Sequence, residues 1–170
     1  KLGVDVWEVI DAAATKPFGF MPFYPGPGLG GHCIPIDPLY LSWRLKSLNF
    51  EARFISLAEE INKKMPNQVV QKTILGLNEI HKSVKNSNIL IIGVAYKNDI
   101  NDVRESPAFD VMTLLNKLGA NLSYHDNYVN EVNFESKKLK SKELSENELS
   151  NYDCVVILTH HTYLDIELIV

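Results

Sequence analysis

A glycine- and proline-rich stretch of the sequence carries a cysteine and an aspartate four positions apart. It reads GLGGHCIPIDP from residue 28 to residue 38. Glycines allow a ligand to approach the backbone closely, so a substrate carbon could come within reach of the Cys33 thiolate. Asp37 could orient a water molecule or accept its proton. The pair predicts nucleophilic chemistry at Cys33, with Asp37 acting on water.

The same two residues also have a structural explanation. Free cysteine is often a small buried hydrophobic residue, and an aspartate beside a helix often caps it. His32 could lower the thiol pKa, although neighbours in sequence need not touch. Because the glycines and prolines of the stretch are hard to explain by packing, the sequence leaves both interpretations open.

A second motif reads GVAYKNDINDVRESP from residue 93 to residue 107. It lies after a predicted strand and before a predicted helix, where doubly wound sheets bind their ligands. Gly93 alone does not make a dinucleotide fingerprint. Lys97 and Arg104 could hold phosphates and Tyr96 could stack on a base. Alternatively, this is a solvated loop whose cations pair with its own carboxylates.

The elements around these motifs predict an α/β protein. Residues 1–85 are expected to form a helical central segment that contains the cysteine loop, and residues 86–170 a Rossmann-like parallel-sheet domain. The segment over residues 16–38 is expected to be irregular, and residues 131–149 are ambiguous. Helices are predicted at residues 4–14, 39–48, 56–84 (with Pro66 starting or kinking a helix), 107–118 (with Ser106 as its cap) and 163–170, and strands at 88–96, 120–125 and 154–159.

Composition excludes several classes of protein. The chain has 170 residues, is 45% hydrophobic and 22% charged, and carries a net charge of −4. Without a basic run, no nucleic acid partner is expected. The longest apolar run, residues 89–96, is too short for a membrane span. Two cysteines make no disulfide framework, so a reducing, cytoplasmic location is expected.

The remaining cysteine and histidines offer little chemistry. Cys154 lies in an apolar run and is expected to be part of the core. His160 and His161 follow that run and could be ligands, but no further residues stand at metal spacing, so no metal is expected. His81 and His125 are expected at the surface.

Together, the two motifs resemble the UDP-glucose/GDP-mannose dehydrogenase family, whose members oxidise a nucleotide sugar to its uronic acid. The resemblance is carried by PGPGLGGHCIPIDP (residues 25–38) and GVAYKNDINDVRESPAFDV (residues 93–111), in the expected order and separation. The segment FYPGPGLGGHCIPIDPLYLSWR is most similar to the bacterial branch of the family that acts on UDP-N-acetylglucosamine. The branch that acts on UDP-glucose is the near relative.

The resemblance implies a mechanism and a cofactor. Family members use two NAD per sugar, and a cysteine holds the sugar as a thiohemiacetal and then as a thioester. By resemblance, Cys33 is this nucleophile, Asp37 positions or activates the hydrolytic water, and Arg104 reaches the NAD. A homodimer is also implied. The residues expected to bind the substrate are Phe23, Tyr24, Pro25, Gly26, Gly30, Tyr96 and Lys97.

Some features depart from the family pattern. Ile36 stands where members often have a lysine, and only Lys16 could replace an arginine that some members donate across the dimer. The glycine-rich NAD-binding domain and most of the central helix do not occur in this sequence. We therefore expect the chain to be the central and C-terminal portion of a dehydrogenase, inactive alone.

Two other hypotheses remain from the sequence. The chain could be a non-catalytic module for UDP-sugar binding or dimerisation, which would not need Cys33. It could also be an unrelated thiol-dependent acyltransferase, but no persuasive base for Cys33 is found.

Overall fold

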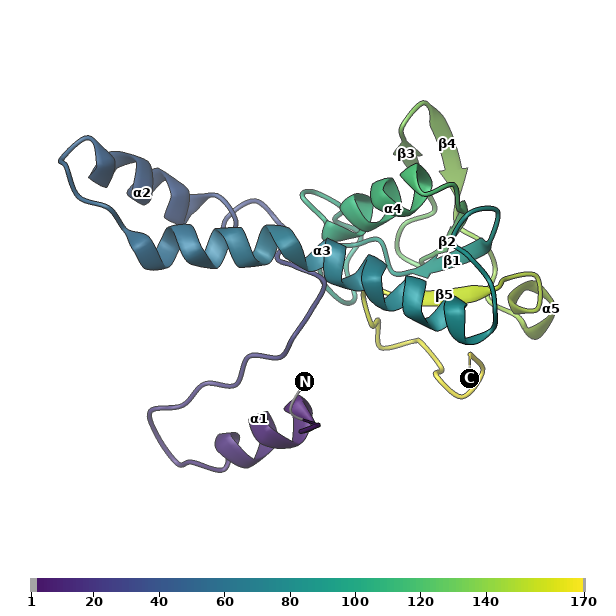
Figure 1. Ribbon diagram of the computed structural model, residues 1–170, viewed down its shortest axis with the longest axis horizontal. Helices are drawn as coiled ribbons and strands as arrows, with labels where there is room; N and C mark the ends of the chain where they lie inside the picture. The colour runs from purple at the N-terminus through teal and green to yellow at the C-terminus, as the bar shows by residue number, and fades with distance from the viewer. Residues whose placement is uncertain (1–2, 170) are drawn as a thin grey trace.

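Helices dominate the first half of the chain, and a small parallel sheet lies in the second half (Figure 1). The computed structural model describes residues 3–169. The helices are α1 (Val6–Ala14), α2 (Asp37–Lys46), α3 (Arg53–Glu79), α4 (Pro107–Lys117) and α5 (Glu146–Leu149). The strands are β1 (Asn88–Ile92), β2 (Asn121–His125), β3 (Glu131–Phe134), β4 (Lys137–Lys140) and β5 (Cys154–Ile157). Within residues 3–169, no helix is long and apolar enough to cross a membrane.

The main sheet has three parallel strands in the order β2-β1-β5. Ile92 in β1 is level with His125 in β2 and with Ile157 in β5. The carboxyl ends of the three strands therefore meet at one edge, where open parallel sheets bind their ligands. Strands β3 and β4, from the segment that the sequence left ambiguous, form a separate antiparallel hairpin.

The larger hydrophobic core lies between the sheet and helices α3 and α4. It includes Ile91 of β1, Leu77 of α3 and Leu115 of α4. The neighbouring strand residue Leu90 belongs to a smaller cluster with Leu164. The last four residues of β1 are 0% exposed, as expected for a parallel strand covered on both faces.

Helix α4 starts as the sequence predicts. The Ser106 hydroxyl accepts a hydrogen bond from the Ala108 N–H, and Pro107 occupies the first helical position. Proline is suited to this position because its missing N–H would have no partner there. Gly119 follows the end of the helix with a φ of 87°, so both ends of α4 agree with the prediction.

Helix α3 and strand β1 differ in length from the prediction. Helix α3 extends from Arg53 to Glu79 rather than over residues 56–84. It continues through Pro66, so this proline does not start a new helix. Strand β1 stops at Ile92 rather than extending over residues 88–96, because Gly93 turns the chain with a φ of 80°. A β-carbon on Gly93 would lie 2.3 Å from the Thr159 carbonyl oxygen, so this turn requires glycine.

The helix predicted over residues 163–170 is wrong for the part of it that the structure describes. Val170 lies outside the described residues. The Glu167 N–H donates to the Asp165 side chain at 3.0 Å, a local bond that competes with helical hydrogen bonds. The buried side chain of Leu164 holds this turn against the smaller cluster.

Two loops carry the predicted motifs. Residues 26–36, here called the cysteine loop, lead into α2, which lies along the first half of α3 (Figure 1). Residues 93–106, here called the β1 loop, connect β1 to α4. Helix α1 lies apart from both and is joined to the cysteine loop by an extended segment (Figure 1).

Candidate functional site

The cysteine loop docks on the β1 loop. The Gly31 N–H donates a hydrogen bond to the Arg104 carbonyl oxygen at 3.0 Å. A β-carbon on Gly30 would lie 2.4 Å from the Tyr96 β-carbon, and one on Gly31 would lie 2.9 Å from the Tyr96 ring. Because no larger residue fits these contacts, the glycines explain how two motifs distant in sequence form one surface.

Cys33 and Asp37 lie at the entry to α2, one helical turn apart. The Cys33 carbonyl oxygen accepts hydrogen bonds from the Ile36 and Asp37 N–H groups at 3.0 and 2.8 Å. Both side chains are exposed to solvent, so the interpretation of Cys33 as a buried hydrophobic residue is wrong. Asp37 does not cap the helix, because Ile36 holds the cap position and makes no side-chain capping bond. The thiol is accessible for reaction.

Arg104 pairs with a carboxylate of its own loop, as one of the two interpretations of that loop predicts. Its Nε donates to both Asp102 oxygens at 3.0 Å and its Nη2 to one of them at 2.6 Å. These hydrogen bonds lower the pKa of Asp102 to about 2 and raise the pKa of Arg104. The charges of His32 and Cys33 contribute in the same directions, which places this ion pair near the cysteine loop.

Substitution of Arg104 by glutamine is expected to raise the pKa of Asp102 from about 2 toward its ordinary value of 3.8, while the backbone N–H of residue 104, which donates to Asp102 at 3.0 Å, still holds it below that value. In the wild type, the folded-state pKa lies below the unfolded value. The pair therefore stabilises the fold above about pH 4 and loses this contribution as the pH falls through about 2. NMR titration of the Asp102 carboxyl carbon tests this. The exposed Arg44→Gln variant is the control, and a wild-type pKa near 3.8 would contradict the prediction.

Tyr96 and Lys97 are neighbours in the β1 loop. The Tyr96 N–H donates to the Asp102 carbonyl oxygen at 3.0 Å, and its partly buried side chain contacts the cysteine loop. Lys97 is exposed, and none of the ion pairs found between residues 3 and 169 involves it. Its ammonium group is therefore available to an anionic ligand.

The turn after β1 does not fit a bound dinucleotide. In Rossmann folds, backbone N–H groups at this turn and at the following helix hold a pyrophosphate. Here the Val94 and Ala95 N–H groups donate to the Asp126 carboxylate at 2.9 and 3.2 Å, and α4 begins only at Pro107. A carboxylate in this position would repel a phosphate. The residues of this turn do not fit NAD.

Tyr24 packs against α1. Its hydroxyl donates to the Asp11 carboxylate at 3.0 Å, and its ring stacks on Trp7 with the ring centroids 5.5 Å apart. Three other residues expected to bind the substrate are exposed: Phe23, Pro25 and Gly26. Neither the Tyr24 hydrogen bond nor its ring stacking involves Cys33.

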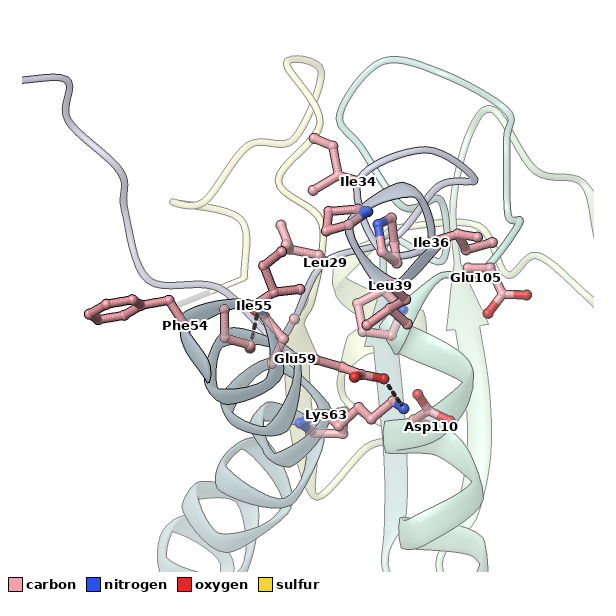
Figure 2. Close-up of a pocket in the computed structure, with 17 residues that line it drawn as sticks. Leu29, Ile34, Ile36, Leu39, Phe54, Ile55, Glu59, Lys63, Glu105 and Asp110 are labelled. Atoms are coloured by element: carbon pink, nitrogen blue, oxygen red, sulfur yellow. Dashed lines mark hydrogen bonds and ion pairs between the residues drawn. The ribbon is translucent and has the colours of Figure 1, made fainter. Parts of the chain in front are cut away.

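A cavity of about 640 Å³ lies between the cysteine loop, α2, α3 and the start of α4 (Figure 2). Its walls are mostly apolar and include Ile34 of the loop and Ile55 of α3. Glu59 and Lys63 of α3 form an ion pair at its edge (Figure 2). Neither predicted catalytic side chain lines it, so the cavity is separate from the thiol.

The prediction of a surface position is wrong for His125 and confirmed for His81. His125 ends β2 and is only 3% exposed. Its Nδ1 lies 2.6 Å from the Lys142 carbonyl oxygen, and its ring packs edge-on against Tyr163. The chain that follows the β3-β4 hairpin covers it, a long-range contact that local sequence does not predict.

Cys154 packs against the larger core, as predicted. Burial raises the pKa of its thiol, which makes it a weak nucleophile. His160 is exposed, whereas His161 is fully buried beside Asp126. Between residues 3 and 169, no group of three or more His, Cys, Asp or Glu side chains is placed to hold a metal ion.

Sequence reasoning missed the roles of Asp126 and His161 in fixing the β1 loop. Asp126 directly follows β2, and His161 follows β5. Polar residues after parallel strands meet at the ligand-binding edge of a sheet, and this signal could have identified them.

The fold is similar to that of solved nucleotide-sugar dehydrogenases. The structure superposes on a UDP-D-ManNAc dehydrogenase from Pyrococcus horikoshii with a TM-score of 0.83 and 28% identity, covering 98% of this chain and 38% of that chain. It also resembles an NDP-N-acetyl-D-galactosaminuronic acid dehydrogenase from Methanosarcina mazei, with a TM-score of 0.81, 27% identity and coverage of 95% and 35%. The predicted α/β class with a Rossmann-like sheet is confirmed.

The sequence identifies the family. Residues 90–168 match the UDP binding domain of the UDP-glucose/GDP-mannose dehydrogenase family, and residues 1–64 match its central domain. The chain belongs to this family, and the resemblance predicted from the two motifs is confirmed.

Relatives in the family act on more than one sugar. A UDP-N-acetyl-D-mannosamine dehydrogenase from Methanococcus vannielii is 34% identical over 95% of this chain and 35% of its own length. A UDP-N-acetyl-D-glucosamine 6-dehydrogenase from Salmonella typhi is 30% identical over 95% of this chain and 37% of its own length. The chain thus spans about a third of the length of these relatives.

Proposed function

We propose that this chain is the UDP-sugar-binding and thiol-bearing part of an NAD-dependent UDP-sugar 6-dehydrogenase. The observation that carries the proposal is the docking of the cysteine loop on the β1 loop through Gly30, Gly31 and Tyr96. This contact joins the segment of the exposed Cys33 to the segment of Lys97. A thiol and a cation that can bind phosphate, carried on two docked loops, suit covalent chemistry on a nucleotide sugar.

In this proposal Lys97 binds the diphosphate of the substrate. Its exposed ammonium lies in no ion pair found between residues 3 and 169, and ammonium groups bind phosphates as point charges. Tyr96 and Gly30 would border the substrate from the docked loops. The exposed segment of residues 23–26 would line the sugar nucleotide.

Cys33 would act as the nucleophile. Its thiolate attacks the C6 aldehyde carbon, a C–S bond forms, and the carbonyl electron pair moves to oxygen, which takes up a proton to give a thiohemiacetal. Asp37, one helical turn further, would accept a proton from the water that later releases the acid. Both side chains are exposed at the entry to α2, where a substrate can reach them.

NAD is the hydride acceptor that we propose from the family. Within residues 3–169, the turn after β1 does not fit a dinucleotide, and the Arg104 guanidinium is bonded to Asp102. A role of Arg104 toward NAD therefore stays a prediction. A homodimer and a cytoplasmic location also stay proposals, the latter supported by two free cysteines.

The substrate that we propose is a UDP-N-acetylhexosamine. The resemblance of the cysteine motif predicts UDP-N-acetylglucosamine or UDP-glucose as the substrate. Relatives include dehydrogenases of both UDP-N-acetyl-D-mannosamine and UDP-N-acetyl-D-glucosamine. These two sugars share the acetamido group and differ in configuration at C2. Discrimination between the two sugars would depend on where the acetamido group at C2 meets its hydrogen-bonding partners on the protein.

The test is NADH and uronic acid formation by a chain that extends over the full length of the relatives. It would be assayed with the UDP forms of N-acetylglucosamine, N-acetylmannosamine and glucose. Because alcohol-to-acid conversion is a four-electron oxidation, about two NADH per sugar are expected with one of the N-acetylhexosamines. UDP binding without NADH from any of these sugars would favour the non-catalytic binding module. NADH formation by the 170-residue chain alone would contradict our placement of the cofactor.

A further inference from the structure

Segments that follow β1, β2 and β5 meet at a group of four polar side chains, two of which are buried. Asp126 and His161 are each 0% exposed, and Asp99 and Thr162 bond to each other beside them. We call these four residues the edge cluster. Burying ionisable groups is unfavourable unless their hydrogen bonds are satisfied, so the partners of each group show what the cluster holds in place.

Asp126 holds the start of the β1 loop. Its Oδ2 accepts hydrogen bonds from the Val94 and Ala95 N–H groups at 2.9 and 3.2 Å, and lies 3.1 Å from Nε2 of His161. Its Oδ1 accepts from the N–H groups of residues 128 and 129 at 2.9 and 3.2 Å. Each oxygen therefore has at least two partners, and the carboxylate is fully used by the protein.

His161 holds the same loop further along, at Asp99. Its Nδ1 accepts a hydrogen bond from the Asp99 N–H at 2.9 Å. The ring proton is therefore assigned to Nε2, which donates to Asp126. The Asp99 carboxylate reaches back to accept from the Thr162 N–H at 2.8 Å and from the Thr162 hydroxyl.

Tyr96 and Lys97 lie between these two fixed points. The Tyr96 ring packs on Gly31 of the cysteine loop, whereas the exposed Lys97 has no such support. The position of the Lys97 backbone is thus set by the bonds of Asp126 on one side and of His161 on the other. A loop fixed in this way loses less conformational entropy when it binds a ligand.

We propose that Asp126 and His161 are positioning residues that hold Lys97 in place for the diphosphate of a nucleotide sugar. The inference rests on the proposed function, in which Lys97 binds phosphate. A residue needed only for packing could be apolar, whereas a buried and fully bonded polar pair fixes one geometry. Binding sites depend on such supporting contacts for their geometry.

Two substitutions of His161 separate its hydrogen bonds. His161→Asn keeps an acceptor close to the position of Nδ1, and His161→Gln keeps a donor close to the position of Nε2. We expect His161→Gln to lower the exchange protection of the Asp99 amide and to weaken UDP binding, each about tenfold, the effect of losing one buried hydrogen bond. His161→Asn is expected to retain most of both. The exposed neighbour variant His160→Asn is the control.

A double-mutant cycle with Lys97→Met distinguishes positioning from general stability. If the edge cluster acts through Lys97, His161→Gln has no further effect on UDP affinity in the Lys97→Met chain. A merely structural role would weaken UDP binding equally in both backgrounds, which would overturn the inference. UDP affinity is measured by calorimetry on the 170-residue chain.

Thr162→Ala provides a second variant in case His161→Gln does not fold. Thr162 is exposed, and its replacement by alanine removes the hydroxyl that donates to Asp99 together with one methyl group, while the backbone N–H that donates to Asp99 stays. We expect UDP affinity to fall about threefold, again only when Lys97 is present. Unchanged affinity in every edge-cluster variant that folds would overturn the inference while the proposed function stands. Failure of the wild-type chain to bind UDP would overturn the proposed function and, with it, the inference.

Discussion

Replacing Cys33 by serine is expected to lower uronic acid formation by at least about 10³-fold in a chain of the relatives' full length. The thiolate is the reactive form of cysteine, and a serine hydroxyl at the same place is un-ionised at neutral pH. Because Cys33 is exposed at the entry to α2, the substitution leaves no cavity in a core. UDP affinity and stability should therefore remain near their wild-type values.

Cys154→Ala is the matched control for this experiment. Cys154 is the other cysteine of the chain, but it lies in β5 against the larger core, and burial raises the pKa of its thiol. Its loss is expected to cost some stability and no catalytic rate. Undiminished uronic acid formation in Cys33→Ser would remove Cys33 from the mechanism and favour the binding-module hypothesis.

Local sequence signals predicted the elements that position the site. The apolar run of β1, the Ser106 cap and Pro107 at the start of α4 are short-range patterns. The cap and the proline have the predicted structure, and the apolar run contains the predicted strand, which ends at Ile92. These patterns depend on hydrophobic periodicity and on capping, which act within a few residues. The sheet edge and the α/β class follow from them.

Contacts between distant segments could not be predicted in the same way. Gly30 and Gly31 indicated that something approaches the backbone, but the sequence did not identify Tyr96 as the neighbour. The sequence analysis expects His125 at the surface, whereas in the fold its ring nitrogen lies against the Lys142 carbonyl oxygen, 17 residues further along the chain. The partner of such a residue is decided by the tertiary structure, on which a local pattern carries no information.

The 85/86 boundary remains a prediction for the same reason. The last turns of α3 belong to the predicted central segment, yet Leu77 packs with Ile91 and Leu115 in the core of the sheet. Helical periodicity predicted that one face of α3 is apolar, but not which other elements would cover it.

Substitution of Gly30 by alanine is expected to separate the two docked loops. The new β-carbon would lie 2.4 Å from the Tyr96 β-carbon and 2.9 Å from the Glu105 carbonyl oxygen. Neither atom is the end of a flexible side chain, so the backbone of one loop has to move. Overpacking of this kind costs about 1–3 kcal/mol of the free energy of unfolding. We expect UDP affinity to fall at least about tenfold, because Cys33 and Lys97 lose their common surface.

The control is Gly76→Ala in α3, since a β-carbon on Gly76 meets nothing within 4 Å. Because alanine is favoured over glycine in a helix, this variant is expected to lose neither stability nor UDP affinity. Urea unfolding without ligand separates two explanations of a loss of UDP binding in Gly30→Ala. If the added methyl group only blocks the ligand, stability stays at the wild-type value. If it separates the loops, stability falls even when no ligand is present. Wild-type stability together with wild-type UDP affinity would show that the docking of these glycines on Tyr96 does not hold the site together.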